Sequence, residues 1–255
     1  MFKEEYELVA GAAKNKILFL KKNPWGYLLL SVLAGMYIGF GTLLIFTGGG
    51  LLAGAPYTRI VMGLSFGIAL SLVVLAGAEL FTGNNFIMAA GLFTKKVSLA
   101  DVVKLWLVCY IGNWLGGLLL AALYSLTQLQ TPEIAEFISK SAVAKASIPF
   151  MALFARAILC NMLVCLAVWS GFKLKSESGK LIMIFWCLFA FITSGFEHSI
   201  ANMTLLSVAI MQPGQLALSV WGYFYNIVVV TLGNMVGGIV FLALPYLAAT
   251  LKKED

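Results

Sequence analysis

The sequence is poor in charge: only 11% of its 255 residues are Asp, Glu, Lys or Arg, whereas 61% are apolar. A soluble globular domain usually carries about 25% charged residues. This scarcity excludes an ordinary soluble domain and indicates a chain built for lipid. The net charge is +6, but the basic residues lie between apolar runs and form no basic face interleaved with aromatics, so nucleic acid is not an expected partner.

Groups that carry enzymatic chemistry are also scarce. The four cysteines lie within predicted spans, and none forms a CxxC or a Cys/His ligand spacing, so we expect buried thiols and no metal site. A single histidine excludes HExxH, and neither a phosphate-binding loop nor a convincing Ser/His/Asp set is present. We expect no cofactor and no enzyme activity. A membrane enzyme or a scaffold is the distant alternative.

Six apolar stretches are long enough to cross roughly 30 Å of hydrocarbon, which takes about 20 helical residues. The second and the fifth are interrupted by polar residues, and a polar, lysine-bearing loop separates the third from the fourth. The predicted fold is one all-α integral membrane domain over residues 1–255. Residues 1–24 are expected to form a cytoplasmic interfacial amphipathic helix. The spans are predicted at residues 27–46, 60–93, 105–126, 149–169, 181–211 and 224–248.

The lysines predict the orientation, because cytoplasmic loops carry an excess of Lys and Arg. The opposite side has only Arg59, Lys140 and Lys145, and Arg156 lies inside the fourth span. We therefore predict a plasma (inner) membrane protein with both termini in the cytoplasm. The lysines on the predicted cytoplasmic side are Lys3, Lys14, Lys16, Lys21, Lys22, Lys95, Lys96, Lys104, Lys173, Lys175, Lys180, Lys252 and Lys253.

An internal repeat is the most informative pattern. The segment 111–117 (IGNWLGG) resembles 232–238 (LGNMVGG), and Glu79 and Glu197 occupy the two interrupted spans at an offset of 118 residues. Two three-span repeats, 25–127 and 147–250, must insert with opposite orientations, because three is odd. Inverted repeats with broken helices are typical of transporters whose solute site lies near the midplane. The paired glycines are expected to let helices pack closely.

Polar residues at the breaks are candidate site residues. His198 is expected to line a path, because ionisable groups at membrane depth are costly, and an imidazole can donate a hydrogen bond or exchange a proton. Thr82 and Asn161 either bond a solute or satisfy a freed backbone carbonyl, and the residues alone leave both open. Glu79 and Glu197 are expected to cap the half-helices by accepting backbone N–H groups.

Each of the remaining candidates has more than one interpretation. Lys145 is either a solvated loop lysine or part of an anion-attracting funnel. Arg156 pairs with a carboxylate, reaches an interface or adds positive potential to the path. Phe66, Phe81 and Phe191 fit packing as well as they fit hydrophobic constrictions that exclude hydrated ions.

The motifs at the breaks resemble those of the formate/nitrite transporter family, and the similarity covers essentially the whole chain. The residues that carry the resemblance are 78–83 (AELFTG), 195–203 (GFEHSIANM), 161–169 and 232–234 (LGN). The segments 23–26 (NPWG), 79–83 and 202–205 (NMTL) are most similar to the nitrite-type branch, with the hydrosulfide-type branch as the alternative.

The resemblance implies an aquaporin-like protomer in a homopentamer, with one path for a small monovalent anion through each protomer in the lipid bilayer. It implies two apolar slits, formed by Phe66, Leu70 and Phe191 and by Leu80 and Phe81. By the same resemblance, Thr82, Asn161 and His198 contact the anion, Lys145 attracts it, and Glu79, Glu197 and Asn202 are structural. The expected cargo is nitrite, with hydrosulfide and formate as alternatives, and transient protonation at His198 is the hypothesis for its passage.

Overall fold

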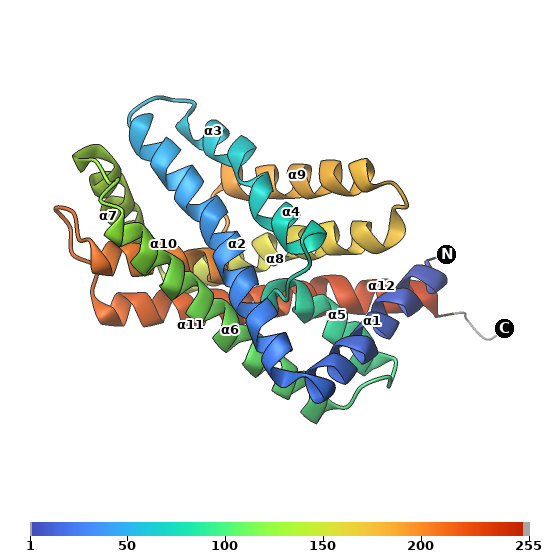
Figure 1. Ribbon diagram of the computed structural model, residues 1–255. Helices are drawn as coiled ribbons and strands as arrows, with labels where there is room; N and C mark the ends of the chain where they lie inside the picture. Colours follow the sequence, from blue (N-terminus) through green and yellow to red (C-terminus); the bar gives the residue numbers. More distant parts are fainter. Residues whose placement is uncertain (1, 252–255) are drawn as a thin grey trace.

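The computed structural model describes residues 2–251, and all regular structure in that part of the chain is helical (Figure 1). Lys252 and Lys253, which entered the orientation prediction, lie outside the described residues. The elements are α1 (Lys3–Lys22), α2 (Pro24–Leu51), α3 (Thr58–Ser65), α4 (Gly67–Leu75), α5 (Phe81–Phe93), α6 (Leu99–Leu126), α7 (Pro132–Ala146), α8 (Phe150–Lys173), α9 (Glu177–Ser194), α10 (Ser199–Met211), α11 (Val220–Gly238), a π-helical turn η1 (Ile239–Ala243) and α12 (Leu244–Thr250).

Six helical segments within residues 2–251 are long and apolar enough to cross a membrane, which confirms the predicted number. They are α2, α3 with α4, α6, α8, α9, and α11 through α12. The first span is longer than the sequence predicts, because α2 continues through Gly48–Gly50. A Cβ at Gly49 or Gly50 would collide with α7, so close packing keeps this glycine run helical.

Close helix pairs build the body of the molecule. α2 packs along α6 and α8 packs along α11. A Cβ at Gly116 would collide with the carbonyl of Val32, and one at Gly237 would collide with the carbonyl of Ile158. Small residues thus let the backbones approach, which confirms the packing role predicted for the paired glycines.

Two helices begin inside the molecule, and both are only 13 residues long, α5 after a break at 76–80 and α10 after a break at 195–198. Such a helix is too short to cross the hydrocarbon alone. Residues 81–91 of α5 and 199–209 of α10 are buried, so both half-helices are enclosed by the other helices (Figure 1). The interruptions predicted in the second and fifth spans are therefore present in the structure.

The segment between the third and fourth spans differs from the sequence-based prediction. It is not a polar loop, because residues 132–146 form the helix α7, with Pro132 in its first turn. Ile134, Ile138 and Ala142 recur every four residues, are buried, and face the protein, while the lysines face away from this stripe or toward a cavity. The charged residues obscured this short apolar stripe in the sequence.

The second span is divided once more than the sequence predicts. α3 ends at Ser65 and α4 begins at Gly67, with Phe66 between them. The Ser65 hydroxyl donates to the carbonyl of Val61, a side-chain bond that competes with the helical pattern and favours a bend. The division turns the buried Phe66 ring toward Phe191, with ring centroids 5.6 Å apart.

The N-terminal segment forms the helix α1, which lies against α5. Tyr6, Val9, Ala13 and Ile17 form its buried stripe, so this apolar face contacts protein. The Tyr6 hydroxyl donates to the carbonyl of Ala243 in the π-helical turn, at 3.1 Å. The position of α1 at the surface of a bilayer stays a prediction.

Candidate functional site

Asn113 of α6 supports the backbone of the first break. Its Oδ1 accepts from the Phe81 N–H at 2.9 Å, and its Nδ2 donates to the carbonyls of Glu79 and Ser31, both at 2.8 Å. The side chain is fully buried. Backbone groups that leave a helix at membrane depth need such partners, since no water satisfies them there. Asn113 therefore fixes the point at which α5 begins.

Asn234 of α11 does the same for the second break. Its Oδ1 accepts from the Ser199 N–H at 2.9 Å, and its Nδ2 donates to the carbonyls of Ala157 at 2.8 Å and Glu197 at 3.0 Å. The repeated Gly-Asn segments are visible in the sequence, but only a packing role was predicted there, for their glycines. An amide side chain in the middle of an apolar span, present in both copies, was the signal for this role.

Glu79 and Glu197 accept from side chains, which corrects the expected capping of backbone N–H groups. Glu79 accepts from Lys16 Nζ at 2.6 Å and from the Tyr27 hydroxyl at 3.0 Å. Glu197 accepts from Lys145 Nζ at 2.8 Å. A lysine ammonium compensates a buried carboxylate better than a neutral N–H, because it supplies a full opposite charge.

An asparagine in the following helix completes each carboxylate's environment. Asn84 Nδ2 donates to Glu79 at 3.0 Å, and Asn202 Nδ2 donates to Glu197 at 2.7 Å. Asn202 also donates to Asn226 Oδ1 at 2.8 Å. The sequence analysis named Asn202 but missed Asn84, although the two lie at the same offset of 118 residues as the glutamates.

His198, and not the glutamate before it, caps the second half-helix. Its Nδ1 accepts from the Ala201 N–H at 3.2 Å, and its Nε2 lies 3.0 Å from Thr82 Oγ1. Because Nδ1 is an acceptor, the proton of the neutral ring sits on Nε2 and is directed at Thr82. Both side chains are buried, so the structure brings together these two predicted site residues.

Asn161 lies behind this pair. Its Nδ2 donates to the carbonyl of Asn234 at 2.6 Å and to the carbonyl of Thr82 at 3.3 Å. Of the two interpretations left open by the sequence, the amide nitrogen thus takes the structural one. Its buried Oδ1 has no hydrogen-bond partner among residues 2–251, which leaves one acceptor beside the break.

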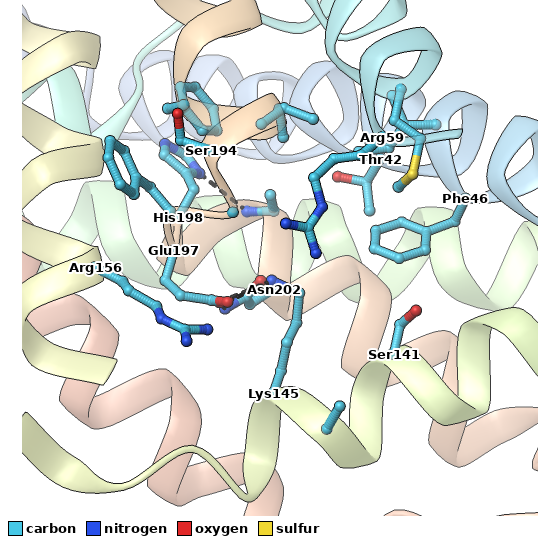
Figure 2. A pocket seen from close by; sticks show the side chains of 18 of the residues that line it. Thr42, Phe46, Arg59, Ser141, Lys145, Arg156, Ser194, Glu197, His198 and Asn202 are labelled. Atoms are coloured by element: carbon cyan, nitrogen blue, oxygen red, sulfur yellow. Dashed lines mark hydrogen bonds and ion pairs between the residues drawn. The ribbon is translucent and has the colours of Figure 1, made fainter. Parts of the chain in front are cut away.

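A cavity of about 470 Å³ opens onto His198 (Figure 2). We call it the His198 cavity. It contains the Lys145–Glu197 ion pair and is also lined by Arg59, Arg156 and Phe191. Arg59 was assigned no role by the sequence analysis. Three cationic side chains and one carboxylate make this cavity electropositive.

A second cavity of about 450 Å³ lies on the other side of the breaks. We call it the Lys16 cavity, because it contains the Lys16–Glu79 ion pair, and Lys180 also lines it. Leu70 and Leu80 form part of its wall. Lys16 was counted by the sequence analysis only as a topology signal.

An apolar seal separates the two cavities. Between them is a void of about 10 Å³ lined by Phe66, Leu70, Leu80, Phe191 and His198, together with Ile38, Val164 and Leu188. A space of that size holds at most about one water molecule. Leu70 and Leu80 also line the Lys16 cavity, whereas Phe191 and His198 also line the His198 cavity. The void is therefore the point at which the two cavities meet.

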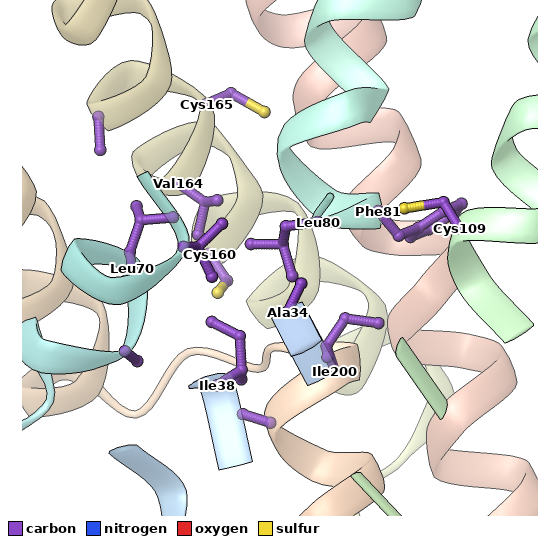
Figure 3. Close-up of a cluster of buried hydrophobic side chains, with 14 of the residues drawn as sticks. Ala34, Ile38, Leu70, Leu80, Phe81, Cys109, Cys160, Val164, Cys165 and Ile200 are labelled. Carbon is purple, nitrogen blue, oxygen red and sulfur yellow. The ribbon is translucent and has the colours of Figure 1, made fainter. Parts of the chain in front are cut away.

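Four of the five predicted constriction residues lie at this seal. Figure 3 shows the side chains of Leu70, Leu80 and Ile38 converging in the buried cluster. Phe81 is buried too, but its ring packs on Tyr110 with centroids 4.9 Å apart and it lines neither cavity nor the void. The structure thus gives Phe81 a packing contact.

The arrangement matches known proteins over its whole length. A profile described as formate/nitrite transporter matches residues 3–248. The chain is 40% identical over 254 residues to the nitrite transporter NirC of Escherichia coli, which covers 99% of this chain and 94% of that protein.

Solved structures agree with the sequence relatives. One, titled FNT family ion channel, superposes with a TM-score of 0.93 at 37% identity and covers 98% of this chain and 100% of the other. Another, titled pentameric formate channel with formate bound, has a TM-score of 0.79 at 30% identity and covers 91% and 99%. Because a family profile and relatives above 30% identity both span nearly the entire sequence, the chain belongs to the formate/nitrite transporter family.

Proposed function

We propose that this protein conducts a small monovalent anion of a weak acid from one cavity to the other through the seal at His198. One observation carries the proposal: two lysine-bearing cavities meet at a void of about 10 Å³ whose wall is apolar except for His198. The lysines attract an anion, while the seal excludes hydrated ions. A polytopic helical membrane protein with this interior fits transport better than catalysis.

Nitrite is the cargo we propose first, because the relative with 40% identity over 94% of its length is a nitrite transporter. Formate is the alternative favoured by the solved channel that holds formate. Hydrosulfide remains the third candidate, from the resemblance of the break motifs. All three are monovalent anions of weak acids, so one path suits each of them.

The geometry at His198 constrains how a proton reaches the anion. A ring that gives its Nε2 proton to the anion and stays neutral must take up another proton at Nδ1. Nδ1 accepts from the Ala201 N–H at 3.2 Å, so this contact must open first. Proton exchange at His198 is therefore coupled to loosening the first turn of α10. A neutral acid then crosses the apolar seal at much smaller cost than the anion.

We further propose a homopentamer with one path in each protomer, two inverted halves at 25–127 and 147–250, and both termini in the cytoplasm of a cell bounded by a plasma (inner) membrane. The pentamer is supported by the solved relative described as a pentameric formate channel, and the orientation is supported by the lysine distribution. Native mass measurement in detergent tests the pentamer. Protease access to a C-terminal tag in sealed inverted vesicles tests the orientation.

Uptake into proteoliposomes tests the function. Purified protein is reconstituted, and entry of nitrite, formate, hydrosulfide and chloride is compared with that into protein-free liposomes. Selective entry of a weak-acid anion without its chemical conversion is expected. Absence of flux for all four anions would favour the membrane enzyme or the scaffold.

Two variants at one position separate the roles of His198. Asn is a good N-cap residue, so His198→Asn keeps an acceptor for the Ala201 N–H but cannot exchange a proton. His198→Phe removes both. If protonation at His198 drives passage, both variants lose the pH dependence of flux. Unchanged flux in His198→Asn at every pH would rule out proton exchange at this residue and leave only a capping role.

A further inference from the structure

The chain has only two arginines, Arg59 and Arg156, and both line the His198 cavity. Every other basic residue is a lysine. The two arginines come from different spans, Arg59 from α3 and Arg156 from α8, and their guanidinium groups extend into the same cavity (Figure 2). The fold thus brings together two side chains that are 97 residues apart in the sequence.

Among residues 2–251, neither guanidinium has a carboxylate partner. The five ion pairs among residues 2–251 all use lysines, and Glu197, the acidic residue of this cavity, is taken by Lys145 and Asn202. Within the described residues, neither guanidinium donates a hydrogen bond to protein, although each carries five N–H donors. The cavity therefore offers two sets of unused donors, whereas its lysine is already occupied.

Both arginines adjoin the break that carries His198. A Cβ built on Gly195 would lie 3.5 Å from Arg59 Nη1, so this guanidinium lies against the backbone just before the histidine. The carbonyl of Arg156 accepts from the Glu197 N–H at 3.3 Å, which anchors α8 to the same break. An anion bound by these groups would therefore lie in the cavity that borders the seal.

Arginine and lysine recognise anions differently. A guanidinium is a planar fork that binds two oxygens at once, whereas an ammonium acts as a point charge. Nitrite and formate are planar and present two acceptor oxygens, whereas hydrosulfide and chloride present a single acceptor atom. Positive charge attracts all four anions alike, whereas the geometry of a guanidinium distinguishes the two-oxygen anions from the other two.

We propose that Arg59 and Arg156 form an oxyanion-binding site in the His198 cavity, which selects planar two-oxygen anions before they reach the seal. This inference rests on the proposed anion conduction and specifies the class of anion. The net positive charge of each cavity supplies attraction, and the two arginines supply discrimination. The Lys16 cavity contains no arginine, so the selection acts at one end of the path.

The double variant Arg59→Lys/Arg156→Lys tests the site, because it keeps both charges and removes both forks. At subsaturating anion, nitrite and formate uptake is expected to fall about three- to tenfold, while hydrosulfide uptake changes less than about twofold. Retained hydrosulfide flux also shows that the variant folds. Unchanged nitrite uptake, or an equal loss for every anion, would overturn the site.

Two further variants complete the design. Arg59→Gln/Arg156→Gln removes the positive charges as well as the guanidinium geometry and is expected to lower uptake of nitrite, formate and hydrosulfide alike. Lys140→Gln removes a charge from α7 at a residue that does not line the cavity, and it should leave every rate unchanged. Wild-type protein that carries no anion would refute the proposed function itself. Wild-type protein that carries hydrosulfide but neither oxyanion would refute only the arginine site.

Discussion

The two breaks share their backbone support but differ in the side chain that meets the seal. At an offset of 118 residues, Gly77 corresponds to Gly195, with φ of 78° and 76°, and both precede a glutamate paired with a lysine. The residue just before the half-helix is Leu80 at one break and His198 at the other. The two breaks therefore share one scaffold, whereas an ionisable side chain meets the seal at only one of them.

The cavities differ in the same way. The His198 cavity has two arginines in addition to its paired lysine, whereas the Lys16 cavity has only lysines as cations. Near the seal, the wall of the Lys16 cavity is apolar and is formed by Leu70 and Leu80. The same substitution made at equivalent positions of the two breaks therefore distinguishes a structural role shared by both breaks from a role that only one of them has.

The supporting asparagines should show the largest and most equal effects. Asn113→Leu and Asn234→Leu each leave three backbone groups without their side-chain partner. We expect each to destabilise the protein by about 3–5 kcal/mol, because each buried unpaired group costs about 1–3 kcal/mol. Thermal unfolding in detergent measures the loss. Strongly unequal losses would contradict equivalent support at the two breaks.

Shortening the seal residue should weaken the barrier itself. Leu80→Ala removes a side chain that is 4% exposed and borders the void. The expected destabilisation is about 2–4 kcal/mol, and chloride leak through proteoliposomes should rise because the apolar constriction widens. Ala34→Gly, a change in the same buried cluster that borders none of the cavities, serves as the control. No rise in leak would show that Leu80 does not close the path.

The two ion pairs should respond unequally to neutralisation. Glu197→Gln leaves Lys145 without its carboxylate, and Glu79→Gln does the same to Lys16. The carboxylate side chain is 3% exposed in the first pair and 11% in the second, so water compensates the first less. We expect losses of about 2–3 and about 1–2 kcal/mol in thermal stability. Adding Lys145→Met to Glu197→Gln should restore part of the first loss, and no recovery would argue against the pair.

The glycines of the breaks should give the smallest effects. Gly77→Ala and Gly195→Ala both put a side chain on a backbone with positive φ, which costs about 1 kcal/mol. A Cβ at Gly77 meets nothing within 4 Å, whereas one at Gly195 approaches Arg59. That approach is an ordinary van der Waals contact, so both variants should lose stability equally and keep the wild-type nitrite uptake. Reduced uptake in Gly195→Ala alone would indicate that the added methyl group displaces the Arg59 guanidinium.

Local patterns determined much of the fold and part of the site. Six apolar stretches are long enough to cross the hydrocarbon, so the number of spans can be predicted from their length. Polar residues inside two of these stretches predict the breaks, because backbone groups that leave a helix inside a membrane need hydrogen-bond partners. His198 and Thr82 could be predicted as site residues because each is a polar residue at an interruption of an apolar span. The role of Lys16 was missed because its partner, Glu79, is 63 residues away in the chain and is adjacent only in space. Asn84 was missed although it lies five residues after Glu79 and repeats the offset of Asn202. The helix α7 was missed because charged residues masked its apolar stripe.

Six membrane-spanning segments, two of them interrupted, and membership of the family could be predicted from the amino-acid sequence. The folded structure was needed to show which lysine pairs with which glutamate, that His198 caps α10 while facing Thr82, and that the two arginines enter one cavity. Hydrophobic length is a property of a single segment and is therefore visible in the sequence. Charge pairing and cavity walls depend on side chains that separate helices bring within a few ångströms.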